Sequence, residues 1–286
     1  MEIKRIGVVF DKCNPRAINI VEDIVKLSIE YGIELIIYPL IPDEILCKYS
    51  NIECVNDISL IKGDIVISIG GDGTILRTFL FLKDKDAPVM GIGLGEKNFL
   101  STATYEDYLD AVNKLFSGKV YFKQEMRLDV ELPKHNINLP PVLNDVVFAT
   151  SIIGKTIDAY VALYEEGSKK IIWHGKSDGV IISTPIGSTA YSYSAGGPVI
   201  DTDLECILIT PLLPVSKKPP LVLKPSRTII LWASRRKSKP VIVLDGQIKV
   251  ELDWDDEVIV KKSKHYANFV VTSKEISVKR IVKSAR

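Results

Sequence analysis

Two turns, each directly after an apolar run, constrain this chain more than any other feature. Gly70-Gly71-Asp72-Gly73-Thr74 follows the run Ile65–Ile69, and Ser183–Tyr191 follows a second apolar run later in the chain. Each pattern predicts a buried strand that ends in a turn with exposed backbone. Glycines let main-chain N–H groups converge on an anion, and a helix starting there adds the positive end of its dipole. The first turn is therefore predicted to bind phosphate.

Asp72 lies inside that turn. A carboxylate among phosphates is unfavourable unless it binds a metal, accepts a proton or orients a hydroxyl, which makes Asp72 the candidate catalytic residue. The alternative is a turn aspartate that caps its own backbone.

Arg77, one turn into the predicted helix, is within reach of a phosphate. The alternative is an ordinary exposed helix arginine.

Composition excludes several classes of protein. The 286 residues carry 37 Lys+Arg against 36 Asp+Glu, so the net charge of +1 gives no overall field that would attract nucleic acid or a membrane surface. No apolar run approaches the ~18 residues that span a bilayer. The four cysteines show no Cys-x-x-Cys spacing, which favours reduced thiols in a cytoplasmic protein.

The hydrophobic pattern predicts two domains of different class. Up to residue 124, apolar strands alternate with helices such as Pro15–Tyr31, which predicts an α/β domain with a mostly parallel sheet. Residues 125–263 contain many short Val-, Ile- and Tyr-rich segments separated by turns, which predicts an all-β domain. The final segment, 264–286, is expected to return to the first domain.

Local signals add detail to this outline. Thr104 is the expected N-cap of a helix over about Glu106–Phe116. The sequences at Glu165–Ser168 and Asp245–Gln247 predict hairpin turns. Pro211–Pro225, with five prolines, is expected to be a long extended loop.

Familiar catalytic motifs are missing or imperfect. The chain has no G-x-x-x-x-G-K-[ST] sequence, which excludes a P-loop kinase. Gly91–Glu96 imitates a dinucleotide fingerprint but ends in Glu96 and is not followed by a clear helix. The three histidines are scattered, and no G-x-S-x-G sequence frames Ser188, so a Ser-His-Asp hydrolase is disfavoured.

A Gly-Gly-Asp-Gly turn occurs in phosphofructokinases, in lipid kinases of the diacylglycerol type and in NAD kinases. The segment Lys176–Pro198 resembles the long signature of NAD kinases almost position for position. Asn144-Asp145-Val146-Val147 and Val243-Leu244-Asp245-Gly246-Gln247 resemble two further motifs of that family in order and spacing. The resemblance extends from Ile65 to Leu252.

Three positions depart from the family pattern. The family often has Arg where Lys176 stands, Gly where Asn98 precedes Phe99, and His after proline where Val215 follows Pro214. These departures leave the donor preference open.

The resemblance implies a two-domain kinase with its active site in the cleft between the domains. The implied reaction is phosphoryl transfer to the 2′-hydroxyl of the adenosine ribose of NAD, which gives NADP. ATP with Mg²⁺ or another divalent cation is the implied donor, although some members of the family accept inorganic polyphosphate. The family commonly forms homodimers or homotetramers through the β domain.

The resemblance also implies a set of site residues. Asp72 would be catalytic, and phosphate would be bound by Gly70, Gly71, Gly73, Thr74 and Arg77. NAD would be bound by Asp72, Gly73, Phe99, Asn144, Asp145, Lys155, Lys176, Asp178, Thr189, Ala190, Tyr191, Ser192, Ser194 and Gln247. No carboxylate cluster marks a metal site in the protein, so the metal ligands are left unassigned.

Two alternatives from other classes remain. A lipid kinase would share the Gly-Gly-Asp-Gly turn but would need an apolar pocket and an approach to membranes. A non-catalytic NAD sensor would use the same dinucleotide-binding residues without turnover, and the presence of Asp72 argues against it.

Overall fold

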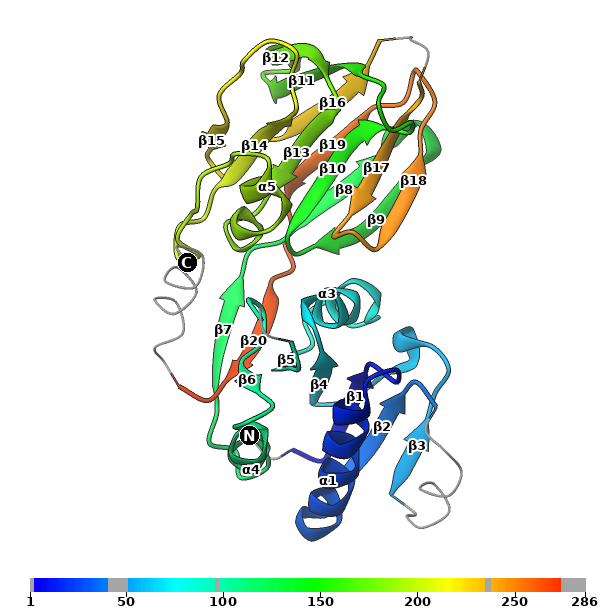
Figure 1. The fold of residues 1–286 in the computed structure, drawn as a ribbon, viewed down its shortest axis with the longest axis vertical. Coiled ribbons are helices and arrows are strands. Elements are labelled where there is room, and N and C mark those ends of the chain that lie inside the picture. Colours follow the sequence, from blue (N-terminus) through cyan, green and yellow to red (C-terminus); the bar gives the residue numbers. More distant parts are fainter. Residues whose placement is uncertain (1–2, 41–50, 96–97, 235–237, 274–286) are drawn as a thin grey trace. The chain divides into compact units, whose positions relative to one another are not determined.

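The computed structural model describes residues 3–40, 51–95, 98–234 and 238–273 (Figure 1). The chain folds into two compact units. The first contains the residues up to Glu125 together with the segment that begins at Tyr266, and the second extends from Met126 to His265. The remaining part of the expected returning segment, 274–286, lies outside the described residues.

The first unit is built on an eight-stranded, mostly parallel sheet. Across the sheet the strands are β3 (Ile52–Cys54), β2 (Glu34–Tyr38), β1 (Arg5–Phe10), β4 (Ile65–Gly70), β5 (Val89–Gly93), β20 (Ala267–Val271) and β7 (Tyr121–Glu125), and β6 (Ala103–Thr104) pairs with β5. The pair β20 and β7 is antiparallel, whereas the other pairs are parallel. Strand β4 is buried along its whole length, as expected for a parallel strand covered on both faces.

The helices described in this unit are α1 (Pro15–Tyr31), α3 (Asp72–Phe81) and α4 (Tyr108–Phe116), with a short 3₁₀ helix η1 (Ile58–Leu60). The Asn14 side chain accepts a hydrogen bond from the Arg16 amide at the start of α1, and Gly32 ends the helix with φ +66°. Helices α1 and α4 bury apolar side chains against β1, β2, β4 and β5 in a common core. On α3, Phe79 packs on Phe269 of β20 with ring centroids 4.9 Å apart.

The expected N-cap of α4 is wrong. The helix begins after Asp107 rather than after Thr104, because Thr104 belongs to β6 and pairs with Gly93. The Asp107 carboxylate accepts a hydrogen bond from the Thr104 hydroxyl at 3.0 Å and so closes the turn between strand and helix.

The second unit contains two six-stranded antiparallel sheets. One has the order β15 (Leu221–Leu223), β14 (Ile207–Leu212), β13 (Gly179–Ser183), β10 (Asp145–Thr150), β17 (Pro240–Leu244) and β18 (Ile248–Glu251). The other has the order β12 (Ser168–Ser177), β11 (Ile157–Glu165), β16 (Ile229–Ala233), β19 (Val258–Lys262), β8 (Leu128–Leu132) and β9 (Ile137–Val142). Short helices complete the unit: η2 (Pro133–His135), η3 (Ile186–Thr189) and α5 (Tyr191–Ser194).

The expected loop Pro211–Pro225 is wrong in part, because the segment contains the end of β14 and all of β15. Pro211 is tolerated in β14 for a positional reason. Strand β15 pairs only with Ile207 to Ile209, so β14 has a free edge at Pro211, where no ladder N–H is required. The predicted combination of a mostly parallel α/β domain and an all-β domain is otherwise confirmed.

Candidate functional site

The Gly70–Thr74 turn joins β4 to α3. Strand β4 ends at Gly70, whose carbonyl accepts a hydrogen bond from the Leu94 amide at 3.1 Å, and Gly71 is the N-cap of α3. A Cβ on Gly70 would lie 2.8 Å from the Cβ of Thr74, so the turn requires glycine there. A Cβ on Gly71 would meet nothing within 4 Å, which leaves open space beside the first amides of the helix. This is the arrangement in which a helix start binds an anion.

Asp72, the first residue of α3, points its carboxylate at neighbouring backbone. Its two oxygens accept hydrogen bonds from the amides of Phe99 and Leu100, each at 3.0 Å. Hydrogen bonds of this kind favour the charged form of a carboxylate and fix its direction. Asp72 is therefore held in a defined orientation, and the expected site residue Phe99 supplies one of the two donors.

Arg77 lies one turn further along α3. Its Nε atom is buried and has no hydrogen-bond partner among the described residues. The guanidinium carbon lies 6.0 Å from the centroid of the Tyr38 ring. An Arg with an unused buried donor is less typical of an exposed helix position than of a site that awaits an acceptor.

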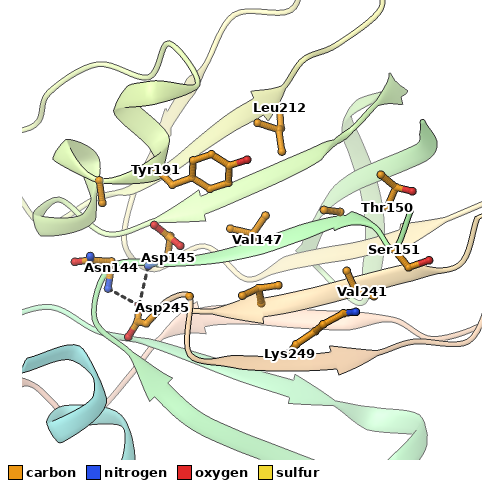
Figure 2. A pocket seen from close by; sticks show the side chains of 14 residues that line it. Asn144, Asp145, Val147, Thr150, Ser151, Tyr191, Leu212, Val241, Asp245 and Lys249 are labelled. Atoms are coloured by element: carbon orange, nitrogen blue, oxygen red, sulfur yellow. Dashed lines mark hydrogen bonds between the residues drawn. The ribbon is translucent and has the colours of Figure 1, made fainter. Parts of the chain in front are cut away.

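A cavity of about 550 Å³ lies in the second unit, on one face of the sheet that contains β10 and β17 (Figure 2). Four of the expected NAD-binding residues line it: Asn144, Asp145, Ala190 and Tyr191. The lining also contains Val147, Ala149, Thr150, Ser151, Leu212, Val241, Val243, Asp245, Gly246 and Lys249. The Asn144 Oδ1 atom is buried without a hydrogen-bond partner among the described residues.

The long signature folds directly against Asn144. The Asn144 carbonyl accepts a hydrogen bond from the Thr184 amide at 2.9 Å, and the Thr184 hydroxyl donates to the Leu143 carbonyl at 2.6 Å. Gly187 comes so close that an added Cβ would lie 2.1 Å from the Asn144 carbonyl oxygen. These contacts bring two segments that the sequence singled out separately to one edge of the cavity.

Asp145 and Asp245 form a buried acidic pair beside the cavity. Each residue is only 5% exposed. Burial, together with the charge of Asp245, raises the pKa of Asp145 from its ordinary value of 3.8 to about 7. Burial also raises the pKa of Asp245, but three backbone amides and the Arg127 guanidinium oppose that change.

Asp245 was predicted to lie in a hairpin turn but not to belong to the site. The available signal was an aspartate in a hairpin turn, a position that tolerates positive φ and hydrogen-bonds to backbone. Asp245 has φ +48° and Gly246 has φ +67°. Lys249, Thr150 and Ser151 were likewise missed, since no local pattern marks them as lining residues.

Several expected NAD-binding residues do not line this cavity. Ser192 is fully buried and its hydroxyl lies 2.7 Å from that of Thr210. Asp178 connects β12 to β13, where its amide donates to the Leu212 carbonyl at 3.0 Å. The others that lie outside the lining are Lys155, Lys176, Thr189, Ser194 and Gln247. The residues Gly70, Gly71, Asp72, Gly73, Thr74, Arg77 and Phe99 belong to the first unit.

Metal ligands are not gathered in the described part of the chain: residues 3–40, 51–95, 98–234 and 238–273 contain no group of three or more His, Cys, Asp or Glu side chains that could hold an ion. None of the helices described in the structure is long and apolar enough to cross a membrane.

Family models match both parts of the chain. Residues 49–120 match the ATP-NAD kinase N-terminal domain, and residues 143–272 match the ATP-NAD kinase C-terminal domain.

Curated relatives match almost the whole chain. An NAD kinase of Methanothermobacter thermautotrophicus is 34% identical over 274 residues, which is 95% of this chain and 93% of that protein. An NAD kinase of Methanosphaera stadtmanae is 35% identical over 93% of this chain and 94% of that protein.

Solved structures share the fold. A yeast NADH kinase crystallised with NADH has a TM-score of 0.87 at 21% identity, covering 99% of this chain and 87% of its own. An NAD kinase from Archaeoglobus fulgidus in complex with ATP has a TM-score of 0.77 at 27% identity, covering 98% of both chains.

Proposed function

This chain belongs to the NAD kinase family, and we propose that it transfers the terminal phosphoryl group of ATP to the 2′-hydroxyl of the adenosine ribose of NAD, forming NADP. The observation that carries the proposal is the Gly70–Thr74 turn with an oriented carboxylate inside it. In the reaction, the ribose oxygen forms a bond to the terminal phosphorus while the bond from that phosphorus to the ADP oxygen breaks.

Asp72 is proposed to receive the hydroxyl proton. An aspartate is a far weaker base than an alkoxide, so the proton moves late, after the new oxygen–phosphorus bond has largely formed. The amides of Phe99 and Leu100 fix the carboxylate, which suits a residue whose larger task is to orient the hydroxyl.

The start of α3 is proposed to bind the donor phosphates. The first turn of α3 carries the positive end of the helix dipole, and Gly70, Gly73 and Thr74 lie at this helix start. Arg77 is proposed to supply the positive charge, because its buried Nε has no acceptor among the described residues.

The cavity of the second unit is proposed to receive the dinucleotide. The unused Oδ1 of Asn144 and the buried carboxyl of Asp145 offer directional hydrogen bonds to ribose hydroxyls. Tyr191 offers a flat face for a base, and Ala190 leaves room beside it. Thr189, Ser194, Phe99 and Gln247 are retained as contacts through the family resemblance.

The remaining parts of the proposal rest on the resemblance alone. They are an active site shared by the domains 1–124 and 125–263, a homodimer or homotetramer, and contacts to NAD from Lys155, Lys176, Asp178 and Ser192. A cytoplasmic location is also proposed, on the cysteine spacing. Inorganic polyphosphate is a second candidate donor.

A divalent cation is proposed to arrive with the nucleotide. The described residues offer no cluster of acidic ligands, and both Asp72 oxygens accept backbone hydrogen bonds, which fits an ion held mainly by phosphate oxygens and water. When bound, such an ion would neutralise phosphate charge.

The test is an assay of NADP formation from NAD and Mg²⁺ with ATP, with polyphosphate or with no donor. The parent protein should form NADP, and Asp72→Asn should lower turnover by at least about 100-fold while NAD still binds. Asp84→Asn is the matched control, because Asp84 is an exposed aspartate of the same unit. NAD binding without turnover by the parent would indicate a sensor, and full turnover by Asp72→Asn would show that Asp72 is not the base.

A further inference from the structure

The turn between β17 and β18 is hydrogen-bonded to the segment that carries Asn144 and Asp145. The Asp245 carboxylate accepts hydrogen bonds from the amides of Leu143 at 2.8 Å, Asn144 at 2.8 Å and Asp145 at 3.1 Å. Figure 2 shows the bonds from Asn144 and Asp145. In return, the Asp245 amide donates to the Asp145 carbonyl at 3.0 Å. A single side chain therefore satisfies three consecutive backbone donors directly before and at the start of β10.

The backbone conformation of the turn suits an aspartate at position 245. Asp245 adopts φ +48°, which is in the left-handed region that aspartate tolerates better than most residues. Hydrogen bonds to a carboxylate are roughly twice as strong as bonds between neutral groups. With three of them, Asp245 is the member of the acidic pair that is equipped to keep its charge.

Asp145 has a different environment. Its carboxyl group accepts no hydrogen bond from the residues that the structure describes, and the side chain faces the cavity (Figure 2). The other charged or titratable side chains that line the cavity are Asp245, Lys249 and Tyr191, and Arg127 acts on Asp245. The charge of Asp245 thus opposes a second charge on Asp145.

We propose that Asp245 is a positioning residue: its carboxylate fixes the backbone of Asn144 and Asp145 for the dinucleotide, and its negative charge beside Asp145 opposes a second charge there until a ligand supplies hydrogen-bond donors. The inference rests on the proposed function, because it assigns the ribose hydroxyls to Asp145. In the empty cavity at pH 6, below the pKa of about 7 that burial and the charge of Asp245 give Asp145, the pair carries one proton on Asp145 and one negative charge on Asp245. When ribose hydroxyls donate to Asp145, they favour its carboxylate, and the proton is released to solvent.

Proton release on NAD binding is the measurable consequence. Burial and the charge of Asp245 raise the pKa of Asp145 to about 7, so at pH 6 the parent should release close to one proton per NAD bound. Calorimetry in buffers of different ionisation enthalpy counts this proton. The affinity for NAD should rise by up to about tenfold per pH unit as the pH is raised from 5 to 7.

Asp245→Asn is the decisive variant. It removes the charge beside Asp145, so the pKa of Asp145 should fall, proton release at pH 6 should decline, and the pH dependence of NAD affinity should move to lower pH. A role confined to folding would weaken binding without moving that pH profile. Asp253→Asn is the matched control, since Asp253 is an exposed aspartate of the same unit that pairs with Lys239 at 2.7 Å. An unchanged profile in Asp245→Asn overturns the proposal.

Asp245→Glu tests the positioning role if Asp245→Asn does not fold. This variant keeps the charge but displaces the turn, because glutamate is longer by one methylene group. NAD affinity should therefore fall at least about tenfold while proton release persists. Unchanged affinity in Asp245→Glu overturns the positioning role. Titration of the Asp145 carboxyl by ¹³C NMR in ligand-free protein tests the coupling without any reaction. If the pKa of Asp145 depends on Asp245 but the parent does not bind NAD, the proposed function and the ligand assignment are refuted. If the parent makes NADP but the pKa of Asp145 does not depend on Asp245, the inference alone is refuted.

Discussion

Substitution of Gly187 by alanine tests whether the long signature and Asn144 form one rigid unit. An alanine Cβ would lie 2.1 Å from the Asn144 carbonyl oxygen and 2.5 Å from its carbonyl carbon. Ordinary van der Waals contact begins at 3.4 Å, so the two backbone segments would have to separate by about 1.3 Å. Both contacts are with main chain, which cannot rotate out of the way as the end of a side chain can.

The separation has two calculable effects. It would break the 2.9 Å hydrogen bond from the Thr184 amide to the same carbonyl, at a cost of about 1 kcal/mol, and would add about 1–3 kcal/mol of overpacking. The free energy of unfolding should therefore fall by about 2–4 kcal/mol. Because a displacement of about 1 Å in a binding constellation can cost 100-fold, kcat/KM for NAD should fall by about that factor.

Steady-state kinetics with NAD and ATP, calorimetric NAD binding and chemical denaturation would measure these effects. Gly175→Ala is the matched control, because a Cβ on Gly175 of β12 meets nothing within 4 Å and φ is not positive there. That control should bind NAD as the parent does. If Gly187→Ala also retained the parent affinity and stability, the argument that backbone contact positions Asn144 would be refuted.

Three other changes have defined outcomes. Burial and the charge of Asp245 raise the pKa of Asp145 from 3.8 to about 7, so the folded state binds this proton more tightly than the unfolded state does. The contribution of Asp145 to the free energy of unfolding should therefore fall by up to about 4 kcal/mol between pH 4 and 7. Denaturation of the parent and of Asp145→Asn at several pH values would measure it as the difference between the two proteins. Ile67→Ala, in fully buried β4, should cost about 2–5 kcal/mol in urea unfolding, and a loss below 1 kcal/mol would contradict the burial argument. Arg77→Ala should raise KM for ATP about tenfold and leave KM for NAD unchanged; an equal effect on both would remove Arg77 from the donor site.

Features that depend on local sequence were predictable. Helix α1 spans Pro15–Tyr31 as expected, because proline at its start and Gly32 at its end act over a few residues. The hairpin turns were equally readable: Glu166 and Asp245 adopt positive φ in turns whose sequence indicated them.

Features that depend on distant partners were not predictable. Thr104 resembles an N-cap until β6 pairs with β5, and Pro211 resembles a loop residue until the length of β15 leaves an edge beside it. The same holds at the site. Asp145 and Asp245 are 100 residues apart, and only the pairing of β10 with β17 brings the carboxylate of one to the backbone of the other. Periodicity carries no information on such a contact.

The place of β20 in the first sheet has a consequence for synthesis. Figure 1 shows this strand inserted between β5 and β7, although the described part of the second unit, Met126–His265, precedes it in the chain. As the polypeptide leaves the ribosome, the second unit can close both of its sheets while the first still lacks an internal strand. Until that strand arrives, β7 lacks its partner along its whole length and β5 lacks its partner at Val89, and such unpaired edges can join foreign strands. The nascent chain is thus most vulnerable to misassembly in its earliest-made half.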